Sequence, residues 1–373
     1  MRTLIGVNDP QAVKRWAAAT AVAINKNSYF GKRMIGEGRE SRMPIQRIDD
    51  LTEGAGDEVT LDLLMPSNAE PIVKDQVLDG KETPLKYYVD RMRIDQMRTG
   101  VDLGSRMTKK RTLRNIRQDA KRVATDWWKR AMDELYFIYL SGSRGTGGGM
   151  VWSADNEFFT VNALTAPDTS HQMYGGAATS KASLVVGDVM SLRLIDRAKA
   201  KCETMGGDGS DELSMLPIDI EGEDHYVCLM HTFQADAIRS NTSTAQWMDI
   251  QKAAAASEGR NNPIFKGGLG MYNNVILHQH RNVIRFSDYG AGANVSAARA
   301  LFLGSQAAFV AYGDNESGTK MKWTEVQRDH ENSVAIGVAA IVGVKKATYK
   351  SKDGSVTRDF GVVALDTANV DPT

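Results

Sequence analysis

The clearest alternation of apolar and polar residues lies within residues 56–142. Residues 58–65 place an apolar side chain at every second position, which predicts a half-buried β-strand that Pro66 ends. A second, less regular alternation follows at residues 86–97, after some twenty residues rich in proline and turn-forming pairs. We therefore expect a long two-stranded excursion within residues 51–100. Because an isolated ribbon is marginally stable in water, it should rest on another surface.

A helical pattern follows the excursion. Apolar residues recur at spacings of three and four over residues 108–140, which predicts one long amphipathic helix. The stripe consists of Leu113, Ile116, Ala120, Ala124, Trp127, Ala131, Leu135 and Ile138. Thr108 is a suitable N-cap, and Gly142 stands where a C-terminal glycine belongs. Of the two adjacent tryptophans, we expect Trp127 in the core and Trp128 against a neighbouring lobe or subunit.

The remaining pattern mixes helices and strands without a regular order. Residues 9–24 predict a helix within a segment, residues 1–50, that we interpret as an extended arm. Residues 187–205 predict a second amphipathic helix, and the chain from residue 320 onward is rich in strands. This mixture indicates an α+β fold. With 373 residues, the chain exceeds the size at which one hydrophobic core usually keeps growing, so we expect at least two packing units.

Composition is that of an ordinary globular protein, with 42% apolar and 25% charged residues. The longest nearly uninterrupted apolar run, residues 334–344, is too short to cross a bilayer, and we expect no membrane partner. The N-terminus lacks the extended apolar region of a signal peptide, so we expect the chain to be made inside a cell. Cys202 and Cys228 are expected as buried, reduced thiols.

The charged residues are distributed unevenly along the chain. The formal net charge is zero, but residues 1–47 carry nine Lys or Arg against three Asp or Glu, residues 48–105 carry six against thirteen, and residues 106–122 carry eight against one. Such alternation can encode docking between elements or chains, and plain solvated faces are the alternative. Positive charge at a helix start opposes the macrodipole, which favours an outside acidic partner, either nucleic acid or the acidic excursion of another copy.

The sequence offers little catalytic chemistry. His278 and His280 would project from one face of a predicted strand and could ligate a metal, but no further ligand stands at a recognised spacing. The glycine-rich residues 142–149 lack the ending of a phosphate-binding loop. We assign no catalytic residue, cofactor or metal, and expect no enzymatic activity. Two alternatives stay open: a DNA-binding protein that uses residues 106–122 and the arm, and a soluble α+β enzyme with an unrecognised site.

The order of these parts resembles a known family. An arm, an acidic two-stranded excursion, a long helix, an inserted lobe and a returning β-rich C-terminus together resemble the major capsid protein of tailed phages, with its Hong Kong 97-type fold. The similarity is greatest over residues 28–142 and points to the coat family of the podovirus N-four. It is carried by the segments SYFGKRMIGEG, GDEVTLDLLMP, LDGKETPLKYYVDRMRIDQMR and DWWKRAMDELYFIYLSG. A looser similarity covers YVCLMHTFQADAIR, NNVILHQH and ALFLGSQAAFVAYG.

The resemblance implies an α+β Hong Kong 97-type fold with a fixed order of parts. These are an N-terminal arm at residues 1–50, an E-loop at 51–100, a peripheral domain at 101–180 with a spine helix at 108–140, an axial domain at 181–320, and a return to the peripheral domain at 321–373.

The resemblance also implies a structural function. Copies would self-assemble as hexamers and pentamers into an icosahedral shell that encloses double-stranded DNA, contacted without sequence specificity. Expected partners are other copies of the chain, scaffolding and portal proteins, and, as an optional addition, decoration proteins. A separate scaffolding protein is expected because no delta-domain is recognisable before the arm. The expected location is the virion capsid, assembled in the cytoplasm of a bacterial host.

A charge-based hypothesis names the contacts between copies. The arm and the E-loop of one copy would lie on its neighbours, and the acidic E-loop would meet the basic start of a neighbour's spine helix. Opposite patches would guide orientation, while apolar burial would supply most of the cohesion. The expected contact residues are Val59, Leu61, Asp62, Asp79, Tyr88, Met92, Arg111, Arg114, Arg117, Lys121, Arg122 and Trp128.

Overall fold

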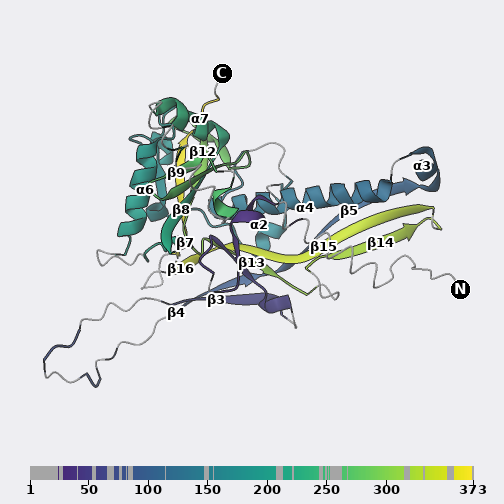
Figure 1. Cartoon of the computed structure of the whole chain (residues 1–373), viewed down its shortest axis with the longest axis horizontal. Helices are drawn as coiled ribbons and strands as arrows, with labels where there is room; N and C mark the ends of the chain where they lie inside the picture. The colour runs from purple at the N-terminus through teal and green to yellow at the C-terminus, as the bar shows by residue number, and fades with distance from the viewer. Residues whose placement is uncertain are drawn as a thin grey trace.

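Two β-sheets and one long helix form the body of the protein in the computed structural model, and a two-stranded ribbon extends from the body (Figure 1). The structure describes residues 24, 28–39, 41–52, 56–64, 71–74, 78–80, 82, 87–113, 115–146, 151–153, 155–206, 213–220, 222–242, 247, 250, 252, 263–266, 268–314, 320–330, 332–350 and 357–371. The helix expected at residues 9–24 therefore lies almost entirely outside the described residues.

The first sheet has six strands arranged around β15. One edge of β15 pairs with β5, and the other edge pairs with β14 and then β13, all antiparallel. The parallel strands β2 and β1 continue beyond β13. The six strands are β1 (Ile35–Glu37), β2 (Ile45–Ile48), β5 (Asp95–Ser105), β13 (Ala308–Tyr312), β14 (Lys322–Arg328) and β15 (Ser333–Lys346). Alternate residues of β15 from Ile336 to Val344 are buried, as expected for a strand with one face against a helix.

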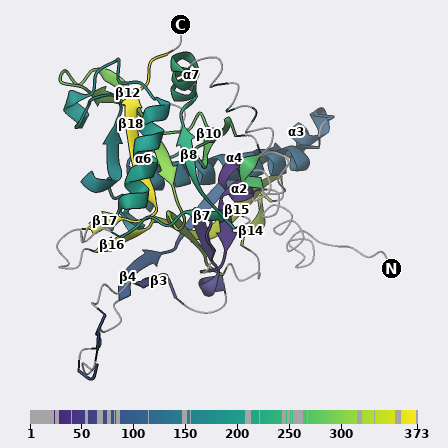
Figure 2. The same cartoon turned by 60° about the vertical axis from the view of Figure 1, so that its left-hand side comes forward.

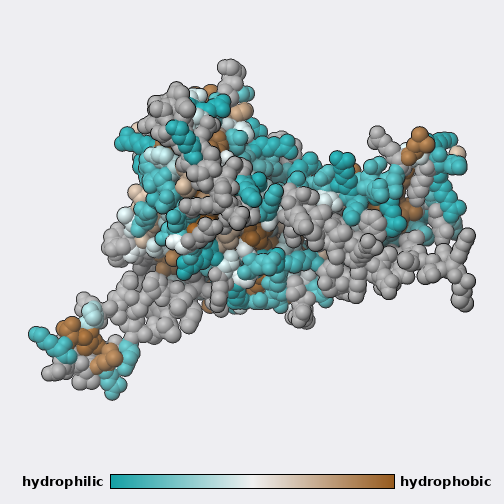
Figure 3. Space-filling view, viewed as in Figure 1, coloured by the Kyte–Doolittle hydropathy of each residue, from teal (hydrophilic) through white to brown (hydrophobic). Residues whose placement is uncertain are grey.

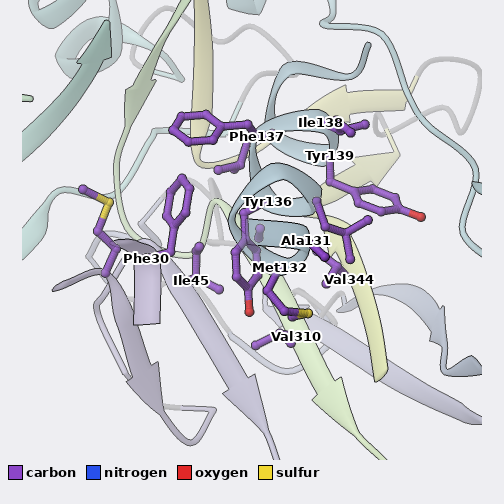
Figure 4. Close-up of a cluster of buried hydrophobic side chains, with 14 of the residues drawn as sticks. Phe30, Ile45, Ala131, Met132, Tyr136, Phe137, Ile138, Tyr139, Val310 and Val344 are labelled. Atoms are coloured by element: carbon purple, nitrogen blue, oxygen red, sulfur yellow. The ribbon is translucent and has the colours of Figure 1, made fainter. Parts of the chain in front are cut away.

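The long helix α4 (Ile116–Ser141) packs on β5 and β15 and reaches β12 (Val295–Leu303) of the second sheet. Gly142 ends it in the left-handed conformation (φ 65°), as predicted. All side chains of residues 131–141 are buried, because this half of the helix is enclosed by both sheets and by the N-terminal segment. Figure 4 shows this packing, with Phe30, Ile45, Met132, Tyr136, Phe137, Val310 and Val344 among the labelled residues.

The single helix expected at residues 108–140 is in fact two helices. The first, α3 (Arg106–Arg111), ends where Thr112 adopts an extended backbone with φ −101° and ψ 140°. The second, α4, begins only after its N-cap Asn115. Thr and Asn side chains compete for backbone hydrogen bonds, so they interrupt the helix although the apolar spacing continues through them. Leu113, expected in the apolar stripe, is consequently fully exposed.

The second sheet has eight strands, in the order β6-β18-β12-β8-β10-β9, with β11 paired to β12 and β7 paired to β8. Helices α6 and α7 lie beside it (Figure 1). The strands are β6 (Gln172–Tyr174), β7 (Ile218–Ile220), β8 (Glu223–Met230), β9 (Gly270–Tyr272), β10 (Val275–Gln279), β11 (Arg285–Tyr289), β12 (Val295–Leu303) and β18 (Val362–Ala368). The helix α6 (Leu192–Thr204) begins five residues later than predicted and ends near its predicted bound, and it buries Leu194, Ile195 and Ala198 in the core of this lobe.

The remaining described elements are smaller. The short helices are α2 (Tyr29–Arg33), α5 (Phe158–Val161), η1 (Asp50–Thr52), η2 (Thr169–His171), η3 (Lys181–Ser183) and η4 (Pro263–Phe265), and α7 spans Thr232–Asn241. Two further pairs of strands are β3 (Glu58–Leu64) with β4 (Tyr87–Arg93), and β16 (Thr348–Lys350) with β17 (Thr357–Asp359).

The strands do not follow the expected domain boundary between residues 320 and 321. Strand β13 lies in the first sheet, although its residues fall within the expected axial domain. Strand β18 lies inside the second sheet, although its residues belong to the expected return to the peripheral domain. All seven residues of β18 are buried, so its sequence shows only that the strand is covered on both faces and not which sheet receives it.

A buried ion pair fastens the end of α4 to the second sheet. The Arg299 guanidinium makes two hydrogen bonds to Asp366, with Nε to Oδ1 at 2.7 Å and Nη2 to Oδ2 at 2.8 Å. It also donates through Nη1 to the Ser141 carbonyl at 2.9 Å. The Tyr289 hydroxyl donates to Asp366 at 2.8 Å. Because these buried charges are paired and hydrogen-bonded, they define how the helix end and the sheet meet.

Candidate inter-subunit surfaces

The expected two-stranded excursion is the ribbon β3–β4, which pairs antiparallel from Glu58 opposite Arg93 to Leu64 opposite Tyr87. Figure 2 shows it projecting from the body, below the two sheets. Its second strand is shorter than predicted. The alternation at residues 86–97 is divided at Ile94, where β4 leaves off and β5 enters the six-stranded sheet.

The apolar face of the ribbon is buried within its own chain. Val59, Leu61 and Met92 are 4%, 6% and 0% exposed, and they form a cluster with Ile48 and Ala311 of the first sheet. The expectation that these three side chains contact a neighbouring copy is therefore wrong. Alternation shows that one face of a ribbon is covered, but it does not show whether the covering surface belongs to the same chain.

Tyr88 also packs within the chain. Its ring lies 5.6 Å from the ring of Tyr349, measured between centroids, beside the buried Phe360. The side chain as a whole is partly exposed, so its contact with another copy stays a prediction.

The outer part of the excursion presents apolar and acidic groups to solvent. Among its described residues, Val73 and Leu78 are 57% and 59% exposed, and Asp79 is exposed beside them. Figure 3 shows the resulting brown area at the far end of the excursion. Gly80 has φ 80°, which fits the predicted Asp-Gly turn. The side chain of Asp62 lies outside the described part of the chain.

The predicted basic contact residues lie at the end of the molecule away from the ribbon, and they differ in how exposed they are. Arg111 and Arg122 are exposed. Arg117 donates through Nε to Glu325 at 3.0 Å, so it serves a contact inside the chain. Lys121 is half-buried, and Arg114 lies outside the described residues.

Exposed apolar residues accompany these charges at the same end of the molecule. They are Met107 at 56%, Leu113 at 107%, Val123 at 56% and Val326 at 46%. Figure 3 shows brown atoms there, at the end of the molecule away from the ribbon. Both ends of the long axis therefore expose apolar side chains beside charged ones. At the ribbon end the described charged residues are Lys74, Asp79 and Glu82, and at the opposite end basic residues predominate.

The predicted roles of the two tryptophans are reversed. Trp128 is 0% exposed in the main core, whereas Trp127 is partly exposed and packs against that core from outside. Adjacent helical residues point about 100° apart, so only one could be central, and Trp128 continues the buried line of Ala120, Ala124 and Ala131. Trp128 is consequently not available as a contact between copies.

The two histidines considered as metal ligands pack inside the chain. His278 is fully buried, with Nε2 2.8 Å from the Ile264 carbonyl, and the His280 ring stacks on Phe137 with centroids 4.9 Å apart. Within the described part of the chain, no three His, Cys, Asp or Glu side chains gather in a way that could hold a metal ion. Cys202 and Cys228 are buried and free, as expected. No helix among the described residues is long and apolar enough to span a membrane.

Comparisons with known proteins agree over almost the whole chain. The model of a family described as "Phage capsid protein" matches residues 4–371. The chain is 43% identical to the capsid protein in the structure "Capsid of Ralstonia phage GP4", with 100% of both chains covered and a TM-score of 0.86. It is 25% identical to the "Major capsid protein" of Pseudomonas phage KPP25, covering 91% of this chain and 90% of that protein. The capsid of cyanophage Pam1 shares the fold at 18% identity, with 89% and 90% of the two chains covered and a TM-score of 0.65.

The two sheets, the projecting ribbon and the long helix form the Hong Kong 97-type fold of phage capsid proteins, as expected. The chain belongs to the phage capsid protein family, as a major capsid protein of a tailed phage. This is a family of structural proteins. From here on, the E-loop means residues 58–93 and the spine helix means α4.

Proposed function

We propose that copies of this chain assemble as hexamers and pentamers into a closed icosahedral shell around double-stranded DNA, with each E-loop lying on a neighbouring copy. The observation that supports this is the exposure of Val73 and Leu78, 57% and 59%, on a loop whose base is buried in its own chain. Exposed apolar groups on an anchored projection are expected where another protein surface covers them.

The charge pattern supports the orientation of this contact. The E-loop carries seven acidic against five basic side chains, and residues 106–122 carry eight basic against one acidic. Arg111 and Arg122 are exposed at the basic end, so they are free to face the E-loop of a neighbour. Individual exposed pairs contribute only about 0–1 kcal/mol, so their effect lies in orientation and in the rate of encounter.

The solved relatives named above are capsids, and this supports the finer parts of the proposal. Of the arm expected at residues 1–50, the described residues from 28 onward belong to the body of their own chain as α2, β1 and β2, so only the part before them would lie on neighbours as the E-loop would. Scaffolding and portal proteins, and optionally decoration proteins, would take part in assembly in the cytoplasm of a bacterial host. The packaged DNA would be contacted without sequence specificity.

Charge reversal tests the orientation. We expect the double variant Arg111→Glu with Arg122→Glu to lower the yield of closed shells at low salt, because like charges would then face each other. The matched control is Arg193→Glu with Arg239→Glu, which reverses two exposed arginines of the second lobe. Electron microscopy and sedimentation measure the shell yield over a range of salt concentrations. Equal yields from both variants and the wild type at every salt concentration would refute the charge contact.

Assembly itself has a separate test. We expect the purified wild-type chain to form closed shells or hexameric and pentameric rings in electron micrographs. A chain that stays a monodisperse monomer under all conditions would contradict the whole proposal.

A further inference from the structure

The E-loop returns to the body at a corner formed by Arg93 and Ile94, and this corner lies close against the first sheet. Arg93 ends β4, and only Ile94 separates it from β5. A Cβ atom on Gly343 of β15 would lie 2.2 Å from the Arg93 carbonyl oxygen, and one on Gly313 would lie 2.8 Å from Ile94. Gly343 therefore has no room for a side chain unless the backbone of the corner moves, whereas at Gly313 a small side chain would displace the methyl groups of Ile94 and Ile341.

Asn162 holds the same corner from the other side. Its Oδ1 accepts a hydrogen bond from the Arg93 amide at 2.9 Å, and its Nδ2 donates to the Arg93 carbonyl at 2.7 Å. Asn162 is only 5% exposed. A residue of a neighbouring strand would make the same pair of hydrogen bonds with the Arg93 backbone. An amide side chain can make both, because it has one donor group and one acceptor; this pair of bonds is called the bracket below.

The backbone of Asn162 is held in turn by the spine helix. The Tyr139 hydroxyl donates to the Asn162 carbonyl oxygen at 2.9 Å. Tyr139 is 2% exposed and belongs to the last turn of α4. Figure 4 shows its side chain leaving the helix on the side away from Phe30. Three hydrogen bonds therefore lead from the C-terminal turn of the spine helix to the corner of the E-loop.

A second anchor on the same edge of β4 comes from the sheet and not from the helix. Lys345 of β15 donates through Nζ to the Arg91 carbonyl at 2.8 Å and forms an ion pair with Asp90. The Thr348 hydroxyl adds a hydrogen bond to Asp90 at 3.2 Å. The two anchors hold neighbouring outward-facing positions of one strand, so they can be compared directly.

We propose that Asn162 is a positioning residue that transmits the position of the last turn of the spine helix to the E-loop. Tyr139 sets the place of Asn162, and Asn162 sets the angle at which β4 leaves the body. A shift of the helix end changes the direction of the E-loop through these contacts. The consequence for assembly rests on the proposed function, but the coupling itself is a property of the single subunit.

Hydrogen exchange on the full-length chain before assembly tests the coupling. Tyr139→Phe removes only the hydroxyl, and Asn162→Ala removes the whole bracket. We expect each variant to speed exchange of the amides in residues 87–94, by about tenfold for Asn162→Ala, which loses two hydrogen bonds. Exchange in β12 of the second sheet should stay unchanged. The double variant should exchange no faster than Asn162→Ala alone, because Tyr139 acts through Asn162.

Lys345→Met is the matched control, because it removes the sheet anchor and leaves the helix anchor intact. Its effect on residues 87–94 should add to that of Tyr139→Phe. The coupling is refuted if Tyr139→Phe leaves the exchange of residues 87–94 unchanged, or if its effect adds in full to that of Asn162→Ala.

Shell yield from the same variants separates this proposal from the proposed function. Faster exchange together with a lower yield supports both. Faster exchange with an unchanged yield supports the coupling and contradicts a role for E-loop direction in assembly. Unchanged exchange refutes the coupling whatever the yield.

Discussion

Single buried polar residues determine how segments far apart in the sequence meet. Asp133 of the spine helix accepts hydrogen bonds from the amides of Tyr29 and Phe30, at 2.9 Å and 3.2 Å, and so caps the N-terminus of α2. Burial raises the pKa of Asp133 to about 6. The N-terminus of α2 favours negative charge, so these two hydrogen bonds oppose part of the effect of burial on Asp133.

His278 makes the stability of the subunit depend on pH. Burial lowers the pKa of His278 to about 4. Between pH 6.5 and 4 the unfolded chain binds a proton on this side chain and the folded chain does not. The contribution of His278 to stability is therefore complete above pH 6.5 and is lost as the pH falls toward 4, by about 3 kcal/mol.

The variant His278→Asn should remove this dependence while keeping a group that can hydrogen-bond to Ile264. Urea unfolding at pH 7 and pH 4.5 measures the free energy of unfolding of both proteins. Other titrating groups, including Asp133, are common to both, so the difference isolates His278. His330→Asn, at an exposed turn, is the control. A His278 variant that loses as much stability as the wild type on acidification would contradict this account.

At the scale of elements, local pattern predicts the type of an element better than its bounds. The spine helix was predicted with its C-terminal glycine, but its start was placed before the interruption at Thr112. The Asn115 side chain offers the backbone a hydrogen bond outside a continuous helix, so apolar spacing alone does not locate the start. The end is clearer, because a left-handed residue after the last turn favours glycine strongly.

Gly142→Ala should destabilise the subunit more than a substitution at an otherwise similar glycine. Gly142 has φ 65°, and a Cβ there would lie 2.0 Å from the Thr165 carbonyl oxygen. Gly222 has φ 85° but open space around it. Both alanine variants incur the left-handed strain of about 1–2 kcal/mol, and Gly142→Ala adds a backbone clash of at least about 1 kcal/mol. Equal losses in denaturant unfolding would show that the turn relaxes freely.

At the scale of the whole molecule, exposed apolar groups at the E-loop end should serve assembly and not folding. We expect Val73→Ser with Leu78→Ser to leave the melting temperature of the subunit within about 1 °C, because exposed substitutions change stability little. The yield of closed shells should fall, because apolar burial between copies is lost.

Val185→Ser with Val186→Ser is the control for this prediction, since these valines are 58% and 57% exposed on the second lobe. Sedimentation velocity measures the assembled fraction of each protein, and thermal unfolding is followed on the unassembled chain. If the E-loop variant assembles as well as the wild type, or no worse than the control, the E-loop end is not an assembly contact.

The sequence by itself determined the kinds of elements and their order. Alternation at residues 58–65 predicted a strand, periodic apolar residues predicted the spine helix, and segments within residues 28–142 carried the resemblance to tailed-phage coat proteins, which the comparisons confirm. These features are local, because they follow from backbone geometry and the spacing of side chains along one element.

Only the tertiary structure decided which surface each element covers. It placed Val59, Leu61 and Met92 inside the subunit and chose Trp128 over Trp127 for the core. It also brought Asn162 to Arg93, across a separation of 69 residues. Such contacts depend on where separate elements pack, and many arrangements satisfy the same local pattern equally well. Their selection is a property of the whole folded chain.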